Sequence, residues 1–515
     1  MTRWIKRLFA RPSSPQAPKV RLGLESLDRR DLPSISLVGT ELLITGNHTR
    51  DLVAVTTNYN GTLTPYDDKV VVLRRFGVGG NPSENLVTDW LYEESATFSM
   101  YTPTRTGFTQ SVKSIKCDLK DGWNEFDTNT SLPSAVYGGK DPDVLKGGWG
   151  ADRLYGKEGS DALWGEGGDD QLFAGDGSDY LYGGQGRDVL VSVGGGADSL
   201  YGGDMNSRYG AIDSYWHDAG DSVEFSFFTD PPPAAVNHTI ASFESLTIGS
   251  TKTAVGLTPN GEDLLEPTSF GTQTVTREDF AGNPLFASVG PRFDDIDQGA
   301  VGDCYFLARL SSLADKNPGH VREMVVDLGD GTYAVQFLDS ANARRFVRVD
   351  GDLWVTAPGV PHHAGLGAES SLWVPIVEKA YAFYRNREGT YASIDGGNSP
   401  THVGGTSKAL GCADTEFGAS SVDGLAFAYS ILNELNKGKA VIMGGPGTLT
   451  NDTKITDANR CVGTHIRMVH SVETNAQGVP TRIFLYDLSG KGLTEFTNFD
   501  LLLHTSGGAK TVVPM

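Results

Sequence analysis

Cys304 stands in a setting that would make a thiol chemically reactive. In the segment DQGAVGDCYFLARLSSLA, Gly299 and Gly302 precede this cysteine, and apolar residues recur at helical spacing after it. The pattern predicts a helix that begins at Cys304. The positive end of a helix dipole favours a thiolate, which is the nucleophile of thiol-dependent hydrolases. Gln298 lies upstream, where its side-chain amide and the Cys304 N–H are expected to bind an oxyanion together.

Two histidines near the C-terminus compete for the role of general base. Both lie in THIRMVHSVETNAQGVPTRIFLYDLSG, which predicts a β-hairpin with its turn near residues 476–477. That turn would place His465 opposite Asp487 and His470 opposite Arg482. The two histidines differ by five positions, so on one strand they face opposite sides. We predict that His465 is the base, oriented by Asp487, and that His470 has a structural role.

These segments resemble calpain-family cysteine proteases. QGAVGDC is similar to the motif that opens the catalytic helix of that family. SLWVPIVEKAYAFYRNREGTYASIDGG, residues 371–397, is similar to its segment of Trp, EKAYA and a Gly-Gly turn, and VGG at 403–405 stands where the family has a further Gly-Gly turn. The resemblance spans residues 294–490.

The resemblance implies a domain with a papain-like α+β fold. It also implies that this domain hydrolyses peptide bonds. It assigns Cys304, His465 and Asp487 to a triad and Gln298 to the oxyanion hole. Two positions depart from the family, since Asp487 replaces an Asn and Ser489 stands where the family has its active-site Trp. A degenerate, inactive protease domain is therefore an alternative.

Calpain cores also bind calcium, and the resemblance gives one partial match. Asp295 matches one family ligand, but Ser371 stands where a second ligand, a Glu, is expected. Glu369 is close enough in sequence to substitute. No calcium site of the core is assigned from the sequence.

Residues 138–204 repeat with a period of nine on the pattern G-G-x-G-x-D-x-L-x. The Gly-rich half is expected to turn, and the x-L-x half to form a strand with its Leu pointing inward. Two nonapeptides would make one coil, so aspartates 18 apart would form two columns. After one inserted residue, Asp198 and Leu200 continue the series. The aspartates in strict register are Asp143, Asp152, Asp161, Asp170, Asp179 and Asp188.

This repeat resembles the RTX, or haemolysin-type, calcium-binding β-roll. The resemblance implies Ca²⁺ as a cofactor, held by carboxylate and carbonyl oxygens. The segment has 13 acidic and 5 basic residues, a net of −8, so the stacked carboxylates would repel one another without cations. A flexible Gly/Asp linker is the alternative, but a linker has no need of leucines in register.

Composition excludes several other classes of protein. The chain has 43 basic and 64 acidic residues, a formal charge of −21, which disfavours nucleic acid as a partner. Its four cysteines show no C-x-x-C spacing, so neither a zinc site nor a dense disulfide framework is expected. An isolated buried cysteine is otherwise core filling, and only the surrounding motif argues for reactivity at Cys304.

The N-terminus gives the main indication of cellular location. No apolar run reaches the roughly 18–20 residues of a membrane span, and the basic first residues lack the apolar core of a signal peptide. RLGLESLDRRDLPS resembles a leader motif that recurs in large planctomycete surface or secreted proteins. We therefore expect a secreted or cell-surface protein.

The elements that must position these residues fall into five predicted regions of a multidomain chain. They are a basic leader (1–33), a small all-β N-terminal domain (34–132), a calcium-binding parallel β-roll (138–204), a β-rich bridging region (205–290) and an α+β papain-like calpain protease domain (291–515).

The sequence supports two main functions. The first is a calcium-linked cysteine endopeptidase acting on polypeptides. The second is a calcium-binding surface or adhesion protein, with cell-surface contacts and an inactive calpain-like domain. A hydrolase of another acyl substrate is a third, since a Cys-His site alone does not specify peptides.

Overall fold

The fold was determined as a computed structural model, which describes most of the chain. The described residues are 34–46, 51–58, 69–77, 90–104, 107–203, 212–224, 237–396, 400–417, 423–444, 466–488, 492–497, 499 and 509–514.

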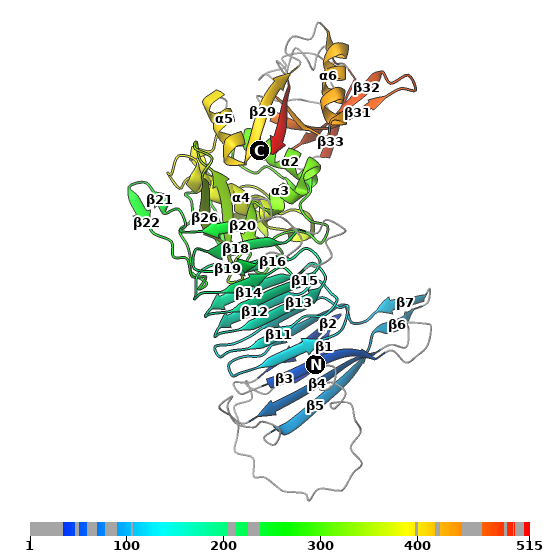
Figure 1. Cartoon of the computed structure of the whole chain (residues 1–515). Coiled ribbons are helices and arrows are strands. Elements are labelled where there is room, and N and C mark those ends of the chain that lie inside the picture. The colour runs from blue at the N-terminus through cyan, green and yellow to red at the C-terminus, as the bar shows by residue number, and fades with distance from the viewer. Residues whose placement is uncertain are drawn as a thin grey trace, which may run out of the picture.

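Two long sheets form a β-solenoid that carries the rest of the molecule at one end (Figure 1). The first sheet has the order β1 (Ser34–Val38), β2 (Glu41–Thr45), β8 (Ser114–Asp118), β10 (Ser134–Tyr137), β12 (Arg153–Glu158), β14 (Gln171–Asp176), β16 (Val189–Ser192), β18 (Ser214–Asp218), β20 (Asn237–Ile240). The second has the order β19 (Ser222–Glu224), β17 (Ser199–Tyr201), β15 (Tyr180–Gln185), β13 (Ala162–Gly167), β11 (Val144–Lys146), β9 (Glu125–Thr128), β3 (Asp51–Asn58), β4 (Lys69–Gly77), β5 (Trp90–Ser99).

The predicted two-nonapeptide coil is confirmed by the strand register. Leu163 of β13 pairs in parallel with Leu145 and Leu181, while Leu172 of β14 pairs with Leu154. Partners 18 residues apart therefore lie directly above one another. These leucines have no exposed surface and form one continuous core between the sheets. The flexible-linker alternative is wrong.

Both sheets run past the predicted ends of the roll. Strand β2 pairs in parallel with β8, and β3 with β9, so the strands of region 34–132 continue the same sheets downward. At the other end β18, β19 and β20 add further strands. A hairpin of β6 (Tyr101–Thr104) and β7 (Gly107–Gln110) projects from the lower part (Figure 1).

Two turns of the roll hold side chains in a conformation that favours glycine. Lys157 and Glu166 have φ of 75° and 74°, at the repeat position where Gly175 and Gly184 have φ of 99° and 114°. A Cβ in this region of φ costs roughly 1–2 kcal/mol. The two repeat positions that lack glycine, at Lys157 and Glu166, therefore carry backbone strain.

Replacing Lys157 by glycine should stabilise the roll. We expect Lys157→Gly to raise the free energy of unfolding by about 0.5–1 kcal/mol, since relief of strain exceeds the entropy that glycine adds to the unfolded chain. Urea unfolding in saturating calcium measures this. Lys140→Gly is the matched control, because Lys140 is exposed on the same roll without a positive φ and should lose stability. Equal effects would contradict the assignment of strain.

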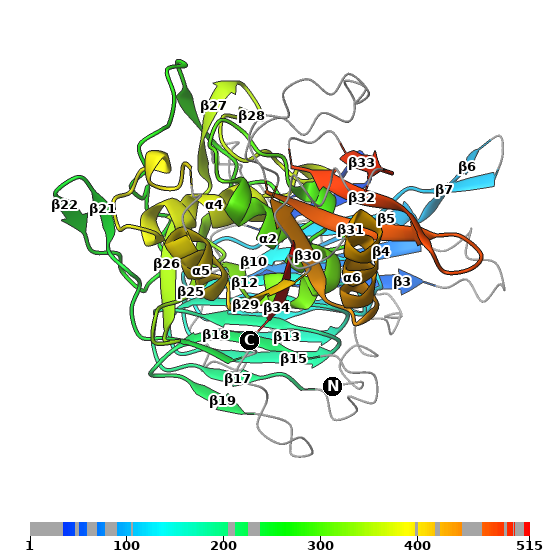
Figure 2. The ribbon, with the colours of Figure 1, turned by 90° about the horizontal axis from the view of Figure 1, so that it is seen from above.

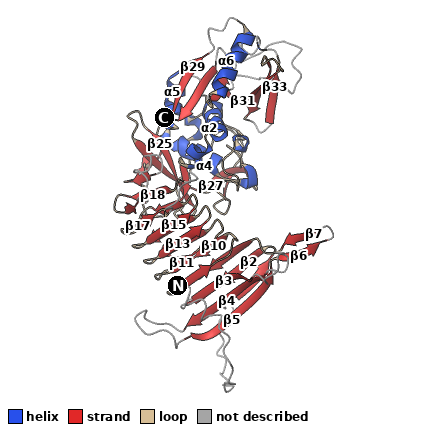
Figure 3. Cartoon of the chain, turned by 45° about the vertical axis from the view of Figure 1, so that its right-hand side comes forward, coloured by secondary structure: helices blue, strands red, loops and turns tan. Residues whose placement is uncertain are grey.

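Helices occur only in the upper part of the described chain (Figure 3). They are α2 (Cys304–Lys316), α3 (Pro318–Arg322), α4 (Trp373–Tyr384), α5 (Pro400–Ala409) and α6 (Gly424–Asn436), with short 3₁₀ turns η2 (Phe293–Asp295), η3 (Ala368–Ser370) and η4 (Tyr391–Ser393).

Four antiparallel sheets complete this upper part. The smaller ones are β21 (Leu246–Ile248) with β22 (Thr251–Thr253); β23 (Thr276–Asp279) with β27 (Asp352–Ala357) and β28 (Val360–Pro361); and β24 (Val325–Asp327) with β25 (Thr332–Leu338) and β26 (Arg344–Asp350). The largest has the order β29 (Cys412–Phe417), β34 (Ala509–Pro514), β30 (Ala440–Gly444), β31 (Ile466–Thr474), β32 (Pro480–Asp487), β33 (Gly492–Phe496).

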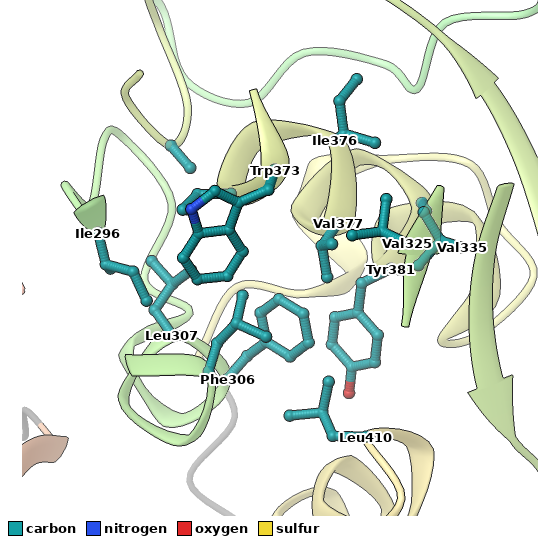
Figure 4. Packing of buried hydrophobic residues seen from close by; sticks show 14 of the residues in the cluster. Ile296, Phe306, Leu307, Val325, Val335, Trp373, Ile376, Val377, Tyr381 and Leu410 are labelled. Atoms are coloured by element: carbon teal, nitrogen blue, oxygen red, sulfur yellow. The ribbon is translucent and has the colours of Figure 1, made fainter. Parts of the chain in front are cut away.

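Helix α2 is the central element of the upper part. Seen from above, it lies between α4 and the central strands β30 and β31 of the six-stranded sheet (Figure 2). Eleven of its thirteen residues are buried. Figure 4 shows Phe306 of α2 facing Tyr381 of α4, and their rings stack with centroids 4.1 Å apart. A helix buried on all sides is well suited to hold the residue at its N-terminus in one position.

The roll packs directly against the upper part through an aromatic ladder. Tyr137, Tyr155 and Phe173 stack on successive coils with centroids 4.6 and 4.5 Å apart. They share an apolar cluster with Val326 and Phe346, from the β24–β26 sheet. The solenoid is thus joined to the helical part by a buried interface.

Candidate active site

The loop before Cys304 is tied to the segment that follows α4. Gly302 donates its N–H to Asp395 Oδ1 at 2.8 Å and accepts the Gly396 N–H at 3.1 Å. The Tyr305 hydroxyl donates to the Ile394 carbonyl at 3.0 Å. The two motifs that resemble calpains in sequence are therefore in contact, and together they fix where α2 begins.

Cys304 opens α2 as predicted, but its thiol is buried. It is 5% exposed, and its Sγ accepts the backbone N–H of Ile466 at 3.4 Å. Burial raises the pKa of the Cys304 thiol above its ordinary value and the charge of Asp303 adds to this, while the Ile466 N–H and Arg467 oppose it. The thiolate expected from the helix dipole is thus not favoured in this conformation, because desolvation outweighs the dipole.

Gln298 lies beside the nucleophile loop with its amide turned inward. Its Nε2 donates to the Val301 carbonyl at 2.6 Å and to Asp303 Oδ1 at 3.3 Å. Its own backbone N–H donates to the Leu488 carbonyl, so the loop is also tied to the end of β32. Both amide hydrogens point to protein acceptors, and binding an oxyanion would require one of them to turn outward.

His470 is distant from Cys304. It packs on the Phe293 ring at 4.5 Å, and its Nδ1 lies 3.6 Å from Asp315 Oδ1. Asp315 is eleven residues beyond Cys304 on the same helix, a rise of about 16 Å. The predicted base His465 lies outside the described residues, which resume at its neighbour Ile466.

The register of the hairpin differs from the prediction by two residues. The turn spans Asn475–Val479, so Met468 pairs with Tyr486 and Val469 with Leu485. The pairing of His470 with Arg482 is also wrong, since a bulge at His470 brings Glu473 opposite Arg482. A shift of two preserves the side-chain alternation, so Asp487 keeps the face that the prediction gave it.

The EKAYA segment on α4 supplies two contacts to the start of α2 and one buried ion-pair centre. Glu378 is buried and lies against Asp303, and Tyr381 stacks on Phe306. The Lys379 ammonium donates to Asp350 Oδ1 at 2.6 Å and also to Glu266. The VGG segment at 403–405 lies within α5, so the turn expected there is wrong.

The calcium ligand of the calpain core does not fit here. Asp295 Oδ2 accepts the Arg292 N–H and the Trp373 indole N–H, both at 2.8 Å, and its Oδ1 accepts the Ala368 N–H at 2.9 Å. Glu369 points elsewhere, to the hydroxyl and amide of Ser288. Asp295 thus serves as an acceptor of backbone and indole hydrogens, and no cation site is assigned to it.

The repeat aspartates form the two columns that the sequence predicts. In one, Asp161 Oδ1 accepts the Asp143 N–H and Asp179 Oδ1 accepts the Asp161 N–H, both at 2.7 Å. In the other, Asp170 Oδ1 accepts the Asp152 N–H at 2.7 Å. Asp188 and Asp198 continue the two columns in the same way.

The columns have the donor chemistry that calcium requires. The second carboxylate oxygens of Asp161, Asp170, Asp179, Asp188 and Asp198 are buried and accept no hydrogen bond from the described part of the protein. A Cβ at Gly165 would meet the Asp170 carboxylate and the Gly183 carbonyl, so only glycine leaves this space open. Unpaired carboxylate oxygens beside carbonyl oxygens suit a hard cation. The residues therefore fit Ca²⁺.

Three members of the columns were missed in the sequence. The Asn124 N–H donates to Asp143 Oδ1, Asp213 Oδ1 accepts from Asp188, and Asp221 Oδ1 accepts from Asp198. Insertions separate Asp213 and Asp221 from the period of nine. The usable signal was an apolar residue two positions after each of them, as in the regular repeats.

Stability without calcium should depend on pH through these aspartates. Burial raises the pKa of Asp152 and Asp179 to about 6, of Asp143 to about 7, of Asp161, Asp170 and Asp198 to about 8, and of Asp188 to about 9. Unfolded aspartate titrates near 3.8, so the folded chain binds protons that the unfolded chain does not. This contribution is fully present below about pH 4 and is lost as pH rises through 6 to 9.

We therefore expect the chelated protein to lose thermal stability as pH rises from 6 to 9, and calcium to restore more stability at the higher pH. Melting curves in chelator and in calcium measure this. Asp170→Asn should reduce the pH dependence, whereas Asp169→Asn, at an exposed aspartate paired with Arg187, should not. A chelated melting temperature that is flat with pH would contradict the assignment.

Two family models match parts of the chain. A model described as calpain family cysteine protease matches residues 271–474, and one described as RTX calcium-binding nonapeptide repeat (4 copies) matches 135–163 and 155–190. Among the described residues no helix is long and apolar enough to cross a membrane.

Curated relatives match a shorter stretch of the chain. The chain is 31% identical over 119 residues to calpain-type cysteine protease DEK1 of Zea mays, which covers 22% of this chain and 5% of the relative. It is 30% identical over 122 residues to calpain-type cysteine protease ADL1 of Oryza sativa subsp. japonica, covering 23% and 5%. The chain thus spans only a small share of the length of these relatives.

Proposed function

We propose that this chain, which carries a calpain-family cysteine protease domain together with RTX calcium-binding repeats, is an exported calcium-linked cysteine endopeptidase. Its protease part would have a papain-like α+β fold, with α2 packed on the β29–β34 sheet. Cys304 would be the nucleophile, His465 the base, Asp487 the orienting group and Gln298 an oxyanion donor.

One contact carries the proposal. The backbone N–H of Ile466 donates to Cys304 Sγ at 3.4 Å, and Ile466 directly follows His465 in the chain. Strand β31 begins one residue after the expected base, and its first residue contacts the expected nucleophile. His470 lies at the other end of α2, beside Asp315.

The chemistry would proceed from these positions. His465 takes the proton from Cys304 Sγ, and the thiolate attacks the peptide carbonyl carbon. The oxyanion is bound by the Cys304 N–H and by Gln298 once its amide turns away from Asp303 Oδ1. His465 then protonates the leaving amine, and water hydrolyses the thioester to release the acid.

A second candidate function rests on the same geometry. The inward amide of Gln298 and the buried, protonated thiol of Cys304 favour a calcium-binding surface protein whose protease domain is inactive. In that case the roll and the sheets below it would carry the binding function.

Casein hydrolysis by the full chain separates these functions. We expect hydrolysis in calcium that a thiol-alkylating inhibitor blocks and that chelation reduces. Equal hydrolysis in chelator would limit calcium to a structural role. If the folded, calcium-loaded chain neither hydrolyses casein nor reacts at Cys304, the endopeptidase proposal fails and the binding function takes its place.

A further inference from the structure

Two buried carboxyl groups meet directly behind the nucleophile. Asp303 precedes Cys304 and is 0% exposed, and Glu378 of α4 is 1% exposed. Asp303 stands at the N-cap of α2, yet its side chain makes no capping hydrogen bond. Its carboxyl group instead lies beside that of Glu378.

The remaining hydrogen bonds leave one oxygen on each group for this contact. Asp303 Oδ1 accepts from Gln298 Nε2 at 3.3 Å, and Glu378 Oε2 accepts the Ala364 N–H at 2.9 Å. Asp303 Oδ2 and Glu378 Oε1 receive no hydrogen from other described groups. Two carboxylates in contact inside a protein cannot both be ionised, so the pair shares one proton.

No cation within the described residues replaces that proton. The ammonium of Lys379 is held by Asp350 and Glu266. His363 faces the pair across Tyr391, on which it stacks at 3.5 Å, and burial lowers the pKa of His363 to about 3, so it is neutral. The other facing groups are the thiol of Cys304 and the buried phenols of Tyr305 and Tyr391, which carry no charge at neutral pH.

We propose that the Asp303–Glu378 pair, held together by one shared proton, is a positioning device for Gln298 and for the start of α2. The shared proton lets both carboxyls stay buried, so Asp303 Oδ1 holds the Gln298 amide beside Cys304. That contact is longer than the one to the Val301 carbonyl, so it is the one that an oxyanion would replace. This inference rests on the proposed endopeptidase function.

Loss of the shared proton would break the contact between Asp303 and Glu378. Burial raises the pKa of Asp303 well above its ordinary range and that of Glu378 to about 7, so the pair keeps one proton at neutral pH. When both groups ionise, their repulsion would separate α4 from the loop before Cys304 and release Gln298. The pair therefore sets an upper pH limit for activity.

The test replaces the shared proton by a permanent donor. In Glu378→Gln the amide donates to Asp303 at every pH, so kcat/KM at pH 6.5 should stay within about threefold of wild type and its alkaline decrease should disappear. Glu378→Leu leaves Asp303 without a partner and should lower kcat at all pH values by about tenfold or more. In Asp303→Asn the new amide donates to Glu378 instead. This variant tests the inference if Glu378→Gln does not fold.

The pH dependence of Cys304 alkylation by iodoacetamide is measured in parallel. An unchanged alkaline limb in a folded, active Glu378→Gln variant would overturn the inference, as would equal losses in the Gln and Leu variants. If wild type hydrolyses no casein, the proposed function fails separately. In that case a Glu378→Gln alkylation profile that differs from wild type supports the pair, and an identical profile overturns it.

Discussion

Replacing Cys304 by alanine should abolish casein hydrolysis and leave the fold intact. Loss of a covalent nucleophile typically costs about 10⁴–10⁶ in kcat, since only binding and oxyanion stabilisation remain. The side chain is small and lies at the helix start, where Ala favours the helix. Initial rates in saturating calcium, with circular dichroism of both proteins, measure the effect.

Cys412 is the matched control for this substitution. It is 2% exposed, its Sγ donates to the Leu410 carbonyl, and burial raises the pKa of its thiol to about 12. It is therefore an inert core thiol, and Cys412→Ala should lower stability by about 1–2 kcal/mol while kcat/KM changes less than about threefold. Comparable loss of activity in both variants would remove Cys304 from the role of nucleophile.

The repeat was predictable because its signal is local and repeated. Leu163 and Leu172 keep both the period of nine and the inward direction, so the coil, its core and the two aspartate columns follow from the sequence. The continuation of the columns through Asp213 and Asp221 did not follow, because these residues lie 25 and 23 positions after their partners instead of 18, while the strands still stack. The number of residues per coil therefore varies along the sequence, although successive strands still stack in the same way.

The active site was predictable as motifs but not as contacts. Sequence placed Cys304 at a helix start, and the structure agrees. It gave no sign that Glu378 would meet Asp303, because the contact joins α2 and α4 across many residues. The hairpin register moved by two because the turn has five residues, Asn475–Val479, and a bulge at His470 then changes the pairing further. Turn length and bulges are set by local backbone geometry that the apolar pattern does not encode.

The residues that fit Ca²⁺ and the candidate catalytic residues lie in different elements of the fold. The calpain-type position Asp295 is already used by three N–H donors, whereas the roll holds five buried carboxylate oxygens that accept no hydrogen bond in the described structure. The aromatic ladder joins that roll to the β24–β26 sheet, which packs beside α2, the helix that begins at Cys304. Any calcium effect on hydrolysis would therefore have to pass through this buried interface.

His465→Ala should reduce kcat/KM by about 10³-fold or more, because the thiol of Cys304 would lose the base that ionises it. His470→Ala is the matched control, since it removes the same type of side chain five residues further along the chain. His470 packs on Phe293 beside Asp315, so its loss should cost about 1 kcal/mol of stability and change kcat/KM less than about threefold. Rates on casein and the pH dependence of iodoacetamide alkylation separate the two.

The alkylation profile makes this prediction independent of substrate binding. In wild type the reactive thiolate should form with His465, so alkylation should begin below the pH at which a buried thiol ionises by itself. Burial already raises the pKa of Cys304, so in His465→Ala the reaction should move to higher pH. In His470→Ala the profile should match wild type. A shift in the His470 variant and none in the His465 variant would transfer the role of base to His470 and would require the C-terminal half of α2 to move toward the substrate.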